Sequence, residues 1–274
     1  MDWPRVKTIL LCVLAAVNAV LLAVYLTNEY AASTAGEKAA ADLRSVLASQ
    51  GMTLADEAIP SWREYALVIE LRRDAAGERA AAEALLGEIR SGEQSGGTVA
   101  YHGSRGTVRF RSAGAFDAEL HYPTGPVSDL VLWSKGLLEE IGLDGMYAPA
   151  GQSVDSTNIF FEQRLGGLPV YGYSAELVFE DGALAALSGS WATGERIKSA
   201  EPEEFVTGAT ALLRFADQVN KRDTPCREIY SLTLGYAPST GAPDYIRLVP
   251  TWRIECDLGV YFVNGLTGEV SGDE

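Results

Sequence analysis

An apolar run near the start of the chain limits its possible folds more than any other feature. The run extends over residues 9–26 and is interrupted by one polar residue, Asn18. A helix of this length rises about 27 Å, which is close to the roughly 30 Å thickness of a bilayer's hydrocarbon core. We therefore expect a transmembrane helix over residues 8–26.

Flanking charges predict the orientation of this helix. Arg5 and Lys7 precede the run, and the first charge after it is Glu29. Positive charges usually stay in the cytoplasm, which predicts a cytoplasmic stub of residues 1–7. A neck of residues 27–36 then leads to an extracellular C-terminal domain.

A cleaved signal peptide is the alternative interpretation of the same run. Its apolar region would usually span about 7–15 residues and end in a small-x-small cleavage site. The run found here is longer, and the residues that follow it match such a site only loosely. We therefore favour an uncleaved signal anchor, which makes the chain a single-pass protein of the cell membrane.

One face of the predicted membrane helix is suited to contact with another helix. Asn18 falls near mid-membrane, where a hydrogen bond to a second helix relieves the cost of an unpaired amide. Small residues spaced four apart lie beside it, and the candidate partner-binding face comprises Ala15, Asn18, Ala19, Leu22 and Ala23. A simple anchor is the alternative, because the chain is rich in alanine throughout and many anchors tolerate a single asparagine.

Charge and composition limit the classes of partner. The formal net charge of −15 argues against binding of nucleic acid or other polyanions. The hydrophobic content of 47% is that of a folded domain and not of a disordered stalk.

Turn signals divide the exported part into two predicted subdomains. The segment Pro123-Thr-Gly-Pro126 is the strongest boundary signal. Residues 37–123 form an N-terminal α+β subdomain, whose apolar patterns predict helices at residues 35–49 and 74–89 and strands at 65–71, 98–102, 107–111 and 115–121.

The C-terminal subdomain, residues 127–274, is predicted to contain one unit twice. The units cover about residues 127–198 and 199–274, and each is a helix followed by a three-stranded meander. The helices fall at residues 128–141 and 202–219, and the strands at 158–165, 168–180, 183–191, 227–236, 245–257 and 259–263. The predicted fold class is therefore α+β, with helices packed on antiparallel β-sheets.

A register for the last long hairpin places two cysteines opposite each other. If the hairpin is centred on Gly241, Tyr230 faces Trp252 and Cys226 faces Cys256. Opposed strand residues have Cα atoms about 4.5–5.5 Å apart, within disulfide range, and export permits oxidation. Cys226 and Cys256 are therefore a candidate disulfide; the alternative is a pair of free core thiols in a register slipped by two residues.

Catalytic and metal-binding patterns are missing from the sequence. The two histidines, His102 and His121, fall on predicted strands without a cluster of further ligands. Neither a Gly-x-Ser-x-Gly motif nor a glycine-rich phosphate loop occurs, and acidic pairs such as Glu139-Glu140 fit helix faces. We expect a binding protein, not an enzyme, with no metal and no cofactor.

Several short motifs match the pattern of one protein family. The most specific is at the N-terminus, where Met1-Asp2-Trp3 and Lys7-Thr8-Ile9 precede an apolar helix with an asparagine in its second half. The later motifs are Gly-Thr-Val-Arg-Phe (106–110), Ala-Gly-Ala-Phe (113–116), the segment 161–171, Trp252 and the tail 261–270. In these motifs the chain resembles the YycI (WalI) family of Gram-positive membrane proteins. The tail and residues 163–171 are also similar to parts of YycH and of PepSY modules.

This resemblance implies a regulator. Family members carry one N-terminal helix and an extracellular α+β domain, and they act with the related protein YycH on the WalK (YycG) sensor histidine kinase, which controls genes of cell-wall metabolism. Contacts between membrane helices carry much of this regulation. The expected partners are thus a WalK/YycG-type kinase, a YycH-like protein and the bilayer around residues 8–26. The alternative is an exported PepSY-like module that inhibits a peptidase or binds a wall ligand, with the helix as a simple anchor.

Overall fold

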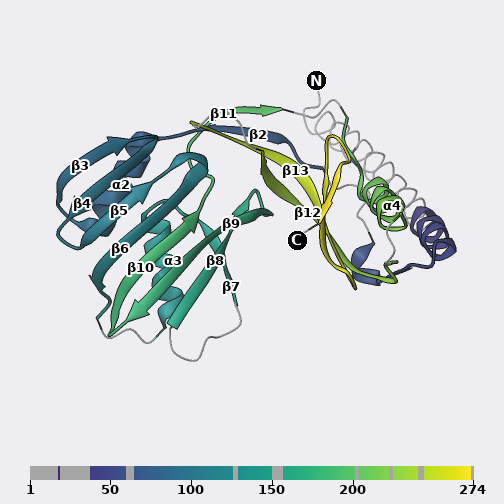
Figure 1. The fold of residues 1–274 in the computed structure, drawn as a ribbon, viewed down its shortest axis with the longest axis horizontal. Helices are drawn as coiled ribbons and strands as arrows, with labels where there is room; N and C mark the ends of the chain where they lie inside the picture. Colours follow the sequence, from purple (N-terminus) through teal and green to yellow (C-terminus); the bar gives the residue numbers. More distant parts are fainter. Residues whose placement is uncertain are drawn as a thin grey trace, which may run out of the picture.

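The computed structural model describes residues 18, 38–59, 65–125, 129–149, 157–200, 204–221, 225–239 and 244–272. These residues form an α+β fold with a large, mostly antiparallel sheet, as predicted (Figure 1). The predicted membrane helix lies outside the described residues, apart from Asn18, which is helical and exposed. No described helix has both the length and the hydropathy that a membrane span requires.

Helices and strands alternate along the chain in short blocks. Residues 38–49 are helical. After them come β1 (Thr53–Leu54), the 3-10 helix η1 (Asp56–Ala58), β2 (Val68–Arg72), α2 (Ala75–Leu86), β3 (Ile89–Ser95), β4 (Thr98–Gly103), β5 (Gly106–Phe110), η2 (Ser112–Gly114), β6 (Ala115–Pro123), α3 (Leu130–Glu140), β7 (Gly145–Ala148), β8 (Thr157–Leu165), β9 (Leu168–Glu180), β10 (Ala183–Ser190), β11 (Glu195–Ala200), α4 (Gly208–Val219), β12 (Glu228–Ser239), β13 (Tyr245–Cys256), β14 (Gly259–Asn264) and β15 (Val270–Gly272).

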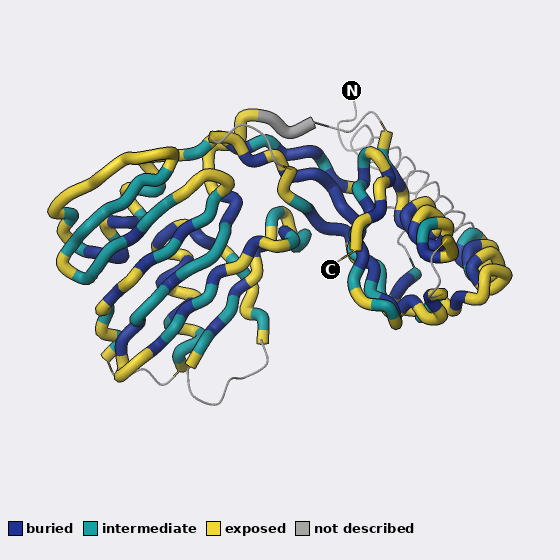
Figure 2. The backbone as a smooth tube through the Cα atoms, viewed as in Figure 1, coloured by how far each residue is buried: buried dark blue, intermediate teal, exposed yellow. Residues whose placement is uncertain are grey.

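Two hydrophobic cores divide the molecule into two lobes (Figure 2). The terminal lobe contains the described residues of 38–73 and 194–272, and the inserted lobe contains those of 74–193. The chain leaves the terminal lobe at the end of β2 and returns to it at β11. These two strands pair with each other, with Arg72 opposite Glu195. The paired strands β2 and β11 therefore connect the inserted lobe to the terminal lobe.

The β8–β9 hairpin makes a second connection between the lobes. Its tip extends to the terminal core, against which Leu165 and Leu168 pack and to which Val170 belongs. Val170 also pairs in parallel with Tyr236 of β12, so hydrogen bonds join the sheets of both lobes.

The inserted lobe contains the same unit twice. The helix α2 precedes the meander β3–β6, and α3 precedes the meander β7–β10. The strands β6 and β10 pair at the centre, which gives the order β7-β8-β9-β10-β6-β5-β4-β3. Both helices cover one face of this sheet (Figure 1). In the terminal lobe, α4 likewise precedes the meander β12–β15.

This arrangement corrects the predicted subdomain division. The strand β6 ends at the proposed boundary, yet it pairs with β10, so residues on both sides of Pro123 share one sheet and one core. The units 127–198 and 199–274 each have four meander strands in place of the predicted three, and a further copy begins at α2. The additional strands escaped prediction because they are short or polar: β3 has mostly exposed residues, β7 has 4 residues and β15 has 3.

The predicted register of the β12–β13 hairpin is wrong. Trp252 pairs with Leu234 and not with Tyr230, and Tyr236 pairs with Pro250. Alternation fixes a register only when one strand face is buried and the other exposed. In β13 all residues from Leu248 to Trp252 are buried, so the pattern did not distinguish the predicted register from the observed one, in which the partner of Trp252 is four residues further along β12.

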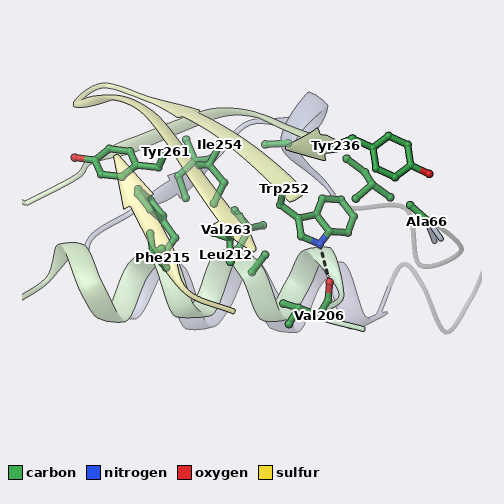
Figure 3. Packing of buried hydrophobic residues seen from close by; sticks show 14 of the residues in the cluster. Ala66, Val206, Leu212, Phe215, Tyr236, Trp252, Ile254, Tyr261 and Val263 are labelled. Carbon is green, nitrogen blue, oxygen red and sulfur yellow. Dashed lines mark hydrogen bonds between the residues drawn. The ribbon is translucent and has the colours of Figure 1, made fainter. Parts of the chain in front are cut away.

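A buried tryptophan organises the core of the terminal lobe. Trp252 is fully buried, and its Nε1–H donates to the carbonyl oxygen of Val206 at 2.6 Å (Figure 3). This bond fixes the chain where it enters α4, whose N-cap Thr207 accepts from the N–H of Thr210. Phe215 of α4 packs over the same sheet, against Tyr261.

Candidate functional site

A cavity of about 500 Å³ lies in the inserted lobe, on the helix-covered face of the sheet. The volume is within the roughly 300–1,000 Å³ typical of small-molecule sites. The cavity is bounded by α2, by the turn that follows α3, and by the ends of β8 and β10. Its lining includes Asp74, Gly77, Glu78, Ala81, Leu85, Val108, Phe110, Arg111, Gly142, Asp144, Gln163, Arg164, Leu187 and Trp191.

The space exists because α2 presents small residues on this side. Gly77 and Ala81 line the cavity, and no bulky apolar side chain of α2 reaches it before Leu85. On the opposite side the chain turns at Gly142, whose φ of +79° suits glycine. Small residues on both sides leave the sheet uncovered between the two helices.

An apolar floor closes the cavity. Val108 and Leu187 are completely buried, and Trp191 is only 2% exposed. A Cβ atom on Gly145 would lie 2.5 Å from Cη2 of Trp191, so glycine at that position allows the ring to reach its place. The floor is rigid and suited to an apolar group.

Gln163 fixes the wall beside this floor. Its side chain is buried, its Nε2–H donates to the carbonyl oxygen of Ala192 at 3.0 Å, and the N–H of Ala192 donates to its Oε1 at 2.7 Å. The side chain thereby acts like one more peptide group beside the chain as it leaves β10. Because both polar atoms are satisfied, the wall is held in one conformation.

The rim of the cavity carries charges of both signs. Glu78 accepts two hydrogen bonds from Arg73, at 2.6 and 2.9 Å, and Arg111 is paired with Asp117. Arg164 donates to the carbonyl oxygen of Gly167.

Two rim carboxylates remain without a cation among the described residues. The carboxylate of Asp74 accepts only the capping bond from the N–H of Ala76, and Asp144 has no ion pair with any described residue. A basic group of a ligand would therefore find two carboxylates at the edge of an apolar floor.

The two histidines of the chain do not line this cavity. His102 on β4 approaches Thr107 on β5, with its Nδ1 2.9 Å from the threonine Oγ1, and His121 is on β6. Neither residue is among those that line the cavity. Of the predicted membrane face, Ala15, Ala19, Leu22 and Ala23 lie outside the described residues.

The two predicted disulfide partners do lie close together. Cys226 and Cys256 are buried and free, and their sulfur atoms and a carboxylate oxygen of Asp257 all lie within 4.8 Å of one another. Burial raises the pKa of the Cys226 thiol, and its hydrogen bond with Asp257 raises this pKa further. Burial also raises the pKa of the Cys256 thiol.

Sequence reasoning missed the cavity. The signal was present in the composition of α2, Ala-Ala-Gly-Glu-Arg-Ala-Ala-Ala-Glu-Ala-Leu-Leu, which has too few large apolar residues to cover a sheet. The sequence of this segment predicts a stable helix, but it does not show that the few apolar side chains leave part of the sheet uncovered. The folded structure places the small residues of α2 over Trp191 and Val108, and this creates the cavity.

Comparison with known proteins gives distant structural likenesses. No family model matches the chain, and no curated protein matches its sequence. Among solved structures, an uncharacterized protein from Eubacterium rectale ATCC 33656 is 10% identical, with a TM-score of 0.47 over 81% of this chain and 90% of that one. The Bacillus megaterium YpeB C-terminal domain is 12% identical, with a TM-score of 0.36 over 74% of this chain and 99% of that one. The resemblance to the YycI family stays a prediction.

Proposed function

We propose that this chain is an exported, membrane-anchored binding module that holds an amphipathic ligand in the cavity between α2 and α3. The cavity itself is the observation that carries this proposal, because it combines an apolar floor with a charged rim. The ligand class that fits is a short peptide with an apolar side chain and a basic group. The apolar side chain would lie against Ala81 and Phe110, which line the cavity and are partly exposed, and the basic group would lie beside Asp74 and Asp144.

Filling the cavity from α2 tests the proposal. In Ala81→Leu a larger side chain occupies the cavity, and we expect binding of the probe acetyl-Leu-Leu-Lys amide, measured by calorimetry, to weaken at least about tenfold, or about 1.4 kcal/mol. Ala80→Leu is the matched control, because Ala80 is exposed on the same helix and does not line the cavity. Equal binding by both variants would refute the proposal.

A second variant tests whether the rim carboxylates select a basic ligand. Asp74→Asn together with Asp144→Asn removes both carboxylates, and asparagine still serves as an N-cap for α2. We expect this variant to lose its preference for the lysine probe over acetyl-Leu-Leu-Glu amide.

Regulation of a sensor kinase is the second candidate function. Its support is the resemblance to the YycI family and the small-residue face around Asn18 on the predicted membrane helix. In this proposal the helix biases a WalK/YycG-type kinase between signalling states, and pairing with a YycH-like protein sets when the bias applies. A tenfold bias requires about 1.4 kcal/mol, comparable to one or two interhelical hydrogen bonds.

Photocrosslinking from position 18 in cells tests this candidate. We expect adducts with a membrane sensor kinase or a YycH-like protein, identified by mass spectrometry. A probe at position 18 together with Ala19→Ile should yield few such adducts, because isoleucine prevents close approach of a second helix. If no specific adduct forms, the helix is a simple anchor and the binding module acts alone.

A further inference from the structure

We propose that Cys226 and Cys256 are joined by a disulfide bond in the exported protein. Cys226 lies just before β12 and Cys256 is the last residue of β13, so the bond would close the long hairpin at its open end. The inference rests on the export in the proposed function but not on the cavity, which lies in the other lobe.

The positions of the two thiols carry the inference. Their sulfur atoms lie within 4.8 Å, and a disulfide requires about 2 Å. Both side chains are buried, 1% and 6% exposed, and both belong to the terminal core. Formation of the bond requires one or both cysteine side chains to change rotamer so that this gap closes.

The backbone around the pair is already held in place. Cys256 pairs with Ile229 across the hairpin, and the N–H of Asp257 donates to the carbonyl oxygen of Glu228 at 3.1 Å. The carboxylate of Asp257 accepts from the N–H of Arg227, with 3.1 Å to each oxygen. A bond between the cysteines would therefore add a covalent link to strand ends that hydrogen bonds already align.

The start of β12, next to Cys226, also holds residues 53–55, which follow the helix of residues 38–49. The carbonyl oxygen of Arg227 accepts from both the N–H and the Oγ1–H of Thr53, at 2.8 and 3.1 Å. The N–H of Ala55 donates to the carbonyl oxygen of Ile229 at 3.0 Å. In this way β1 is attached to the beginning of β12, one residue beyond Cys226. The disulfide would strengthen the connection between residues 38–55 and the sheet.

The chemistry is a thiol–disulfide exchange with an exported oxidoreductase that carries a disulfide. The thiolate of one cysteine attacks a sulfur of that disulfide, forming a mixed disulfide and releasing one thiolate. The second cysteine thiolate then attacks the cysteine sulfur of the mixed disulfide and displaces the other oxidoreductase thiolate. The two cysteines lose two protons and two electrons, and the oxidoreductase becomes a dithiol. Because both thiols are buried after folding, the bond forms before the lobe closes.

A metal ion is the competing occupant of this cluster. Structural zinc sites have four protein ligands, whereas the described residues place only three ligand atoms here, those of Cys226, Cys256 and Asp257. The carboxylate of Asp257 is also engaged by the N–H groups of Arg227 and Glu228. The observations therefore favour the disulfide.

The test uses the full-length chain with Cys12→Ser, exported through an oxidising compartment and purified in detergent without reductant. We expect no thiol that reacts with an alkylating agent after denaturation, and a mass lower by two hydrogen atoms than that of the reduced protein. Reduction should lower the midpoint of thermal unfolding by about 10 °C and accelerate hydrogen exchange at the amides of Thr53 and Ala55.

The variant Cys226→Ser with Cys256→Ser, in the same background, is the matched control. We expect it to unfold at the midpoint of the reduced protein, to show no response to reductant, and to bind the lysine probe unchanged. Two reactive thiols in the unreduced protein would overturn the proposal. One bound zinc per chain, with thiols released by a chelator, would overturn it in favour of a metal site.

Discussion

Trp252→Ala is expected to destabilise the terminal lobe by about 3–5 kcal/mol, because it leaves a large cavity in a closely packed core. The indole is fully buried and touches the ring of Phe205, with centroids 6.2 Å apart. The substitution also leaves the carbonyl oxygen of Val206 without its donor. Native-state hydrogen exchange measures the effect lobe by lobe, and protection should fall in β12–β14 and stay largely unchanged in β4–β6.

Trp252→Phe separates packing from hydrogen bonding. Phenylalanine retains most of the apolar contact and removes only the N–H donor, so we expect a smaller loss, about 1–3 kcal/mol. A loss in Trp252→Ala below about 1 kcal/mol would contradict the central role assigned to this residue. An equal loss of protection in both lobes would contradict the division into two cores.

Arg73→Met is expected to destabilise the inserted lobe by about 3 kcal/mol. The side chains of Arg73 and Glu78 are only 16% and 11% exposed, so the substitution leaves a nearly buried carboxylate without its partner. The guanidinium also donates to the carbonyl oxygens of Gly97 and Phe110, and both bonds would be lost. Urea unfolding and hydrogen exchange in α2 and β4 are the measurements.

Two further variants make this result interpretable. Replacing both partners, in Arg73→Met with Glu78→Leu, should recover much of the loss, because no unpaired charge remains buried. The control is Arg79→Met in the exposed pair Arg79–Glu83 of α2, the helix that carries Glu78, where we expect a change below about 0.5 kcal/mol. If both arginine variants lose the same stability, burial of the Arg73 pair has no special role.

The interiors of the regular elements could be predicted from the sequence. Periodicity placed β9 and α2 closely, and Asp74, the first residue of the predicted helix at 74–89, caps α2, with its side chain accepting from the N–H of Ala76. The hairpin turns at Gly166-Gly167 and Asp181-Gly182 lie between the strands predicted at 158–165, 168–180 and 183–191, and all four turn residues have the positive φ values that such turns require. In these cases local forces and the fold agree.

Long-range pairing could not be predicted. The exposed pattern of β3 gives no signal of a strand, and nothing local indicates that β6 pairs with β10 across Pro123. The cysteines lie close together even though the predicted register was wrong: Cys256 pairs with Ile229, and Cys226 lies three residues before Ile229, ahead of β12. The cavity could not be foreseen either, since it results from what α2 and α3 together leave uncovered.

Insertion of one lobe into the other constrains the order in which the chain can acquire its structure. The strand β2 must pair with the residues at the start of β13, Tyr245 with Arg72 and Leu248 with Ile69, and the entire inserted lobe lies between them in sequence. In a chain that emerges from its N-terminus, the inserted lobe can complete its sheet while β2 still lacks this partner. Closing so large a loop is slow in itself. Once the inserted lobe has folded, the effective loop is shorter, because the two ends of this lobe meet where Arg72 pairs with Glu195. The last strands to emerge therefore complete the part of the molecule nearest to the N-terminus, so a chain truncated before β13 would retain one finished lobe and one exposed edge.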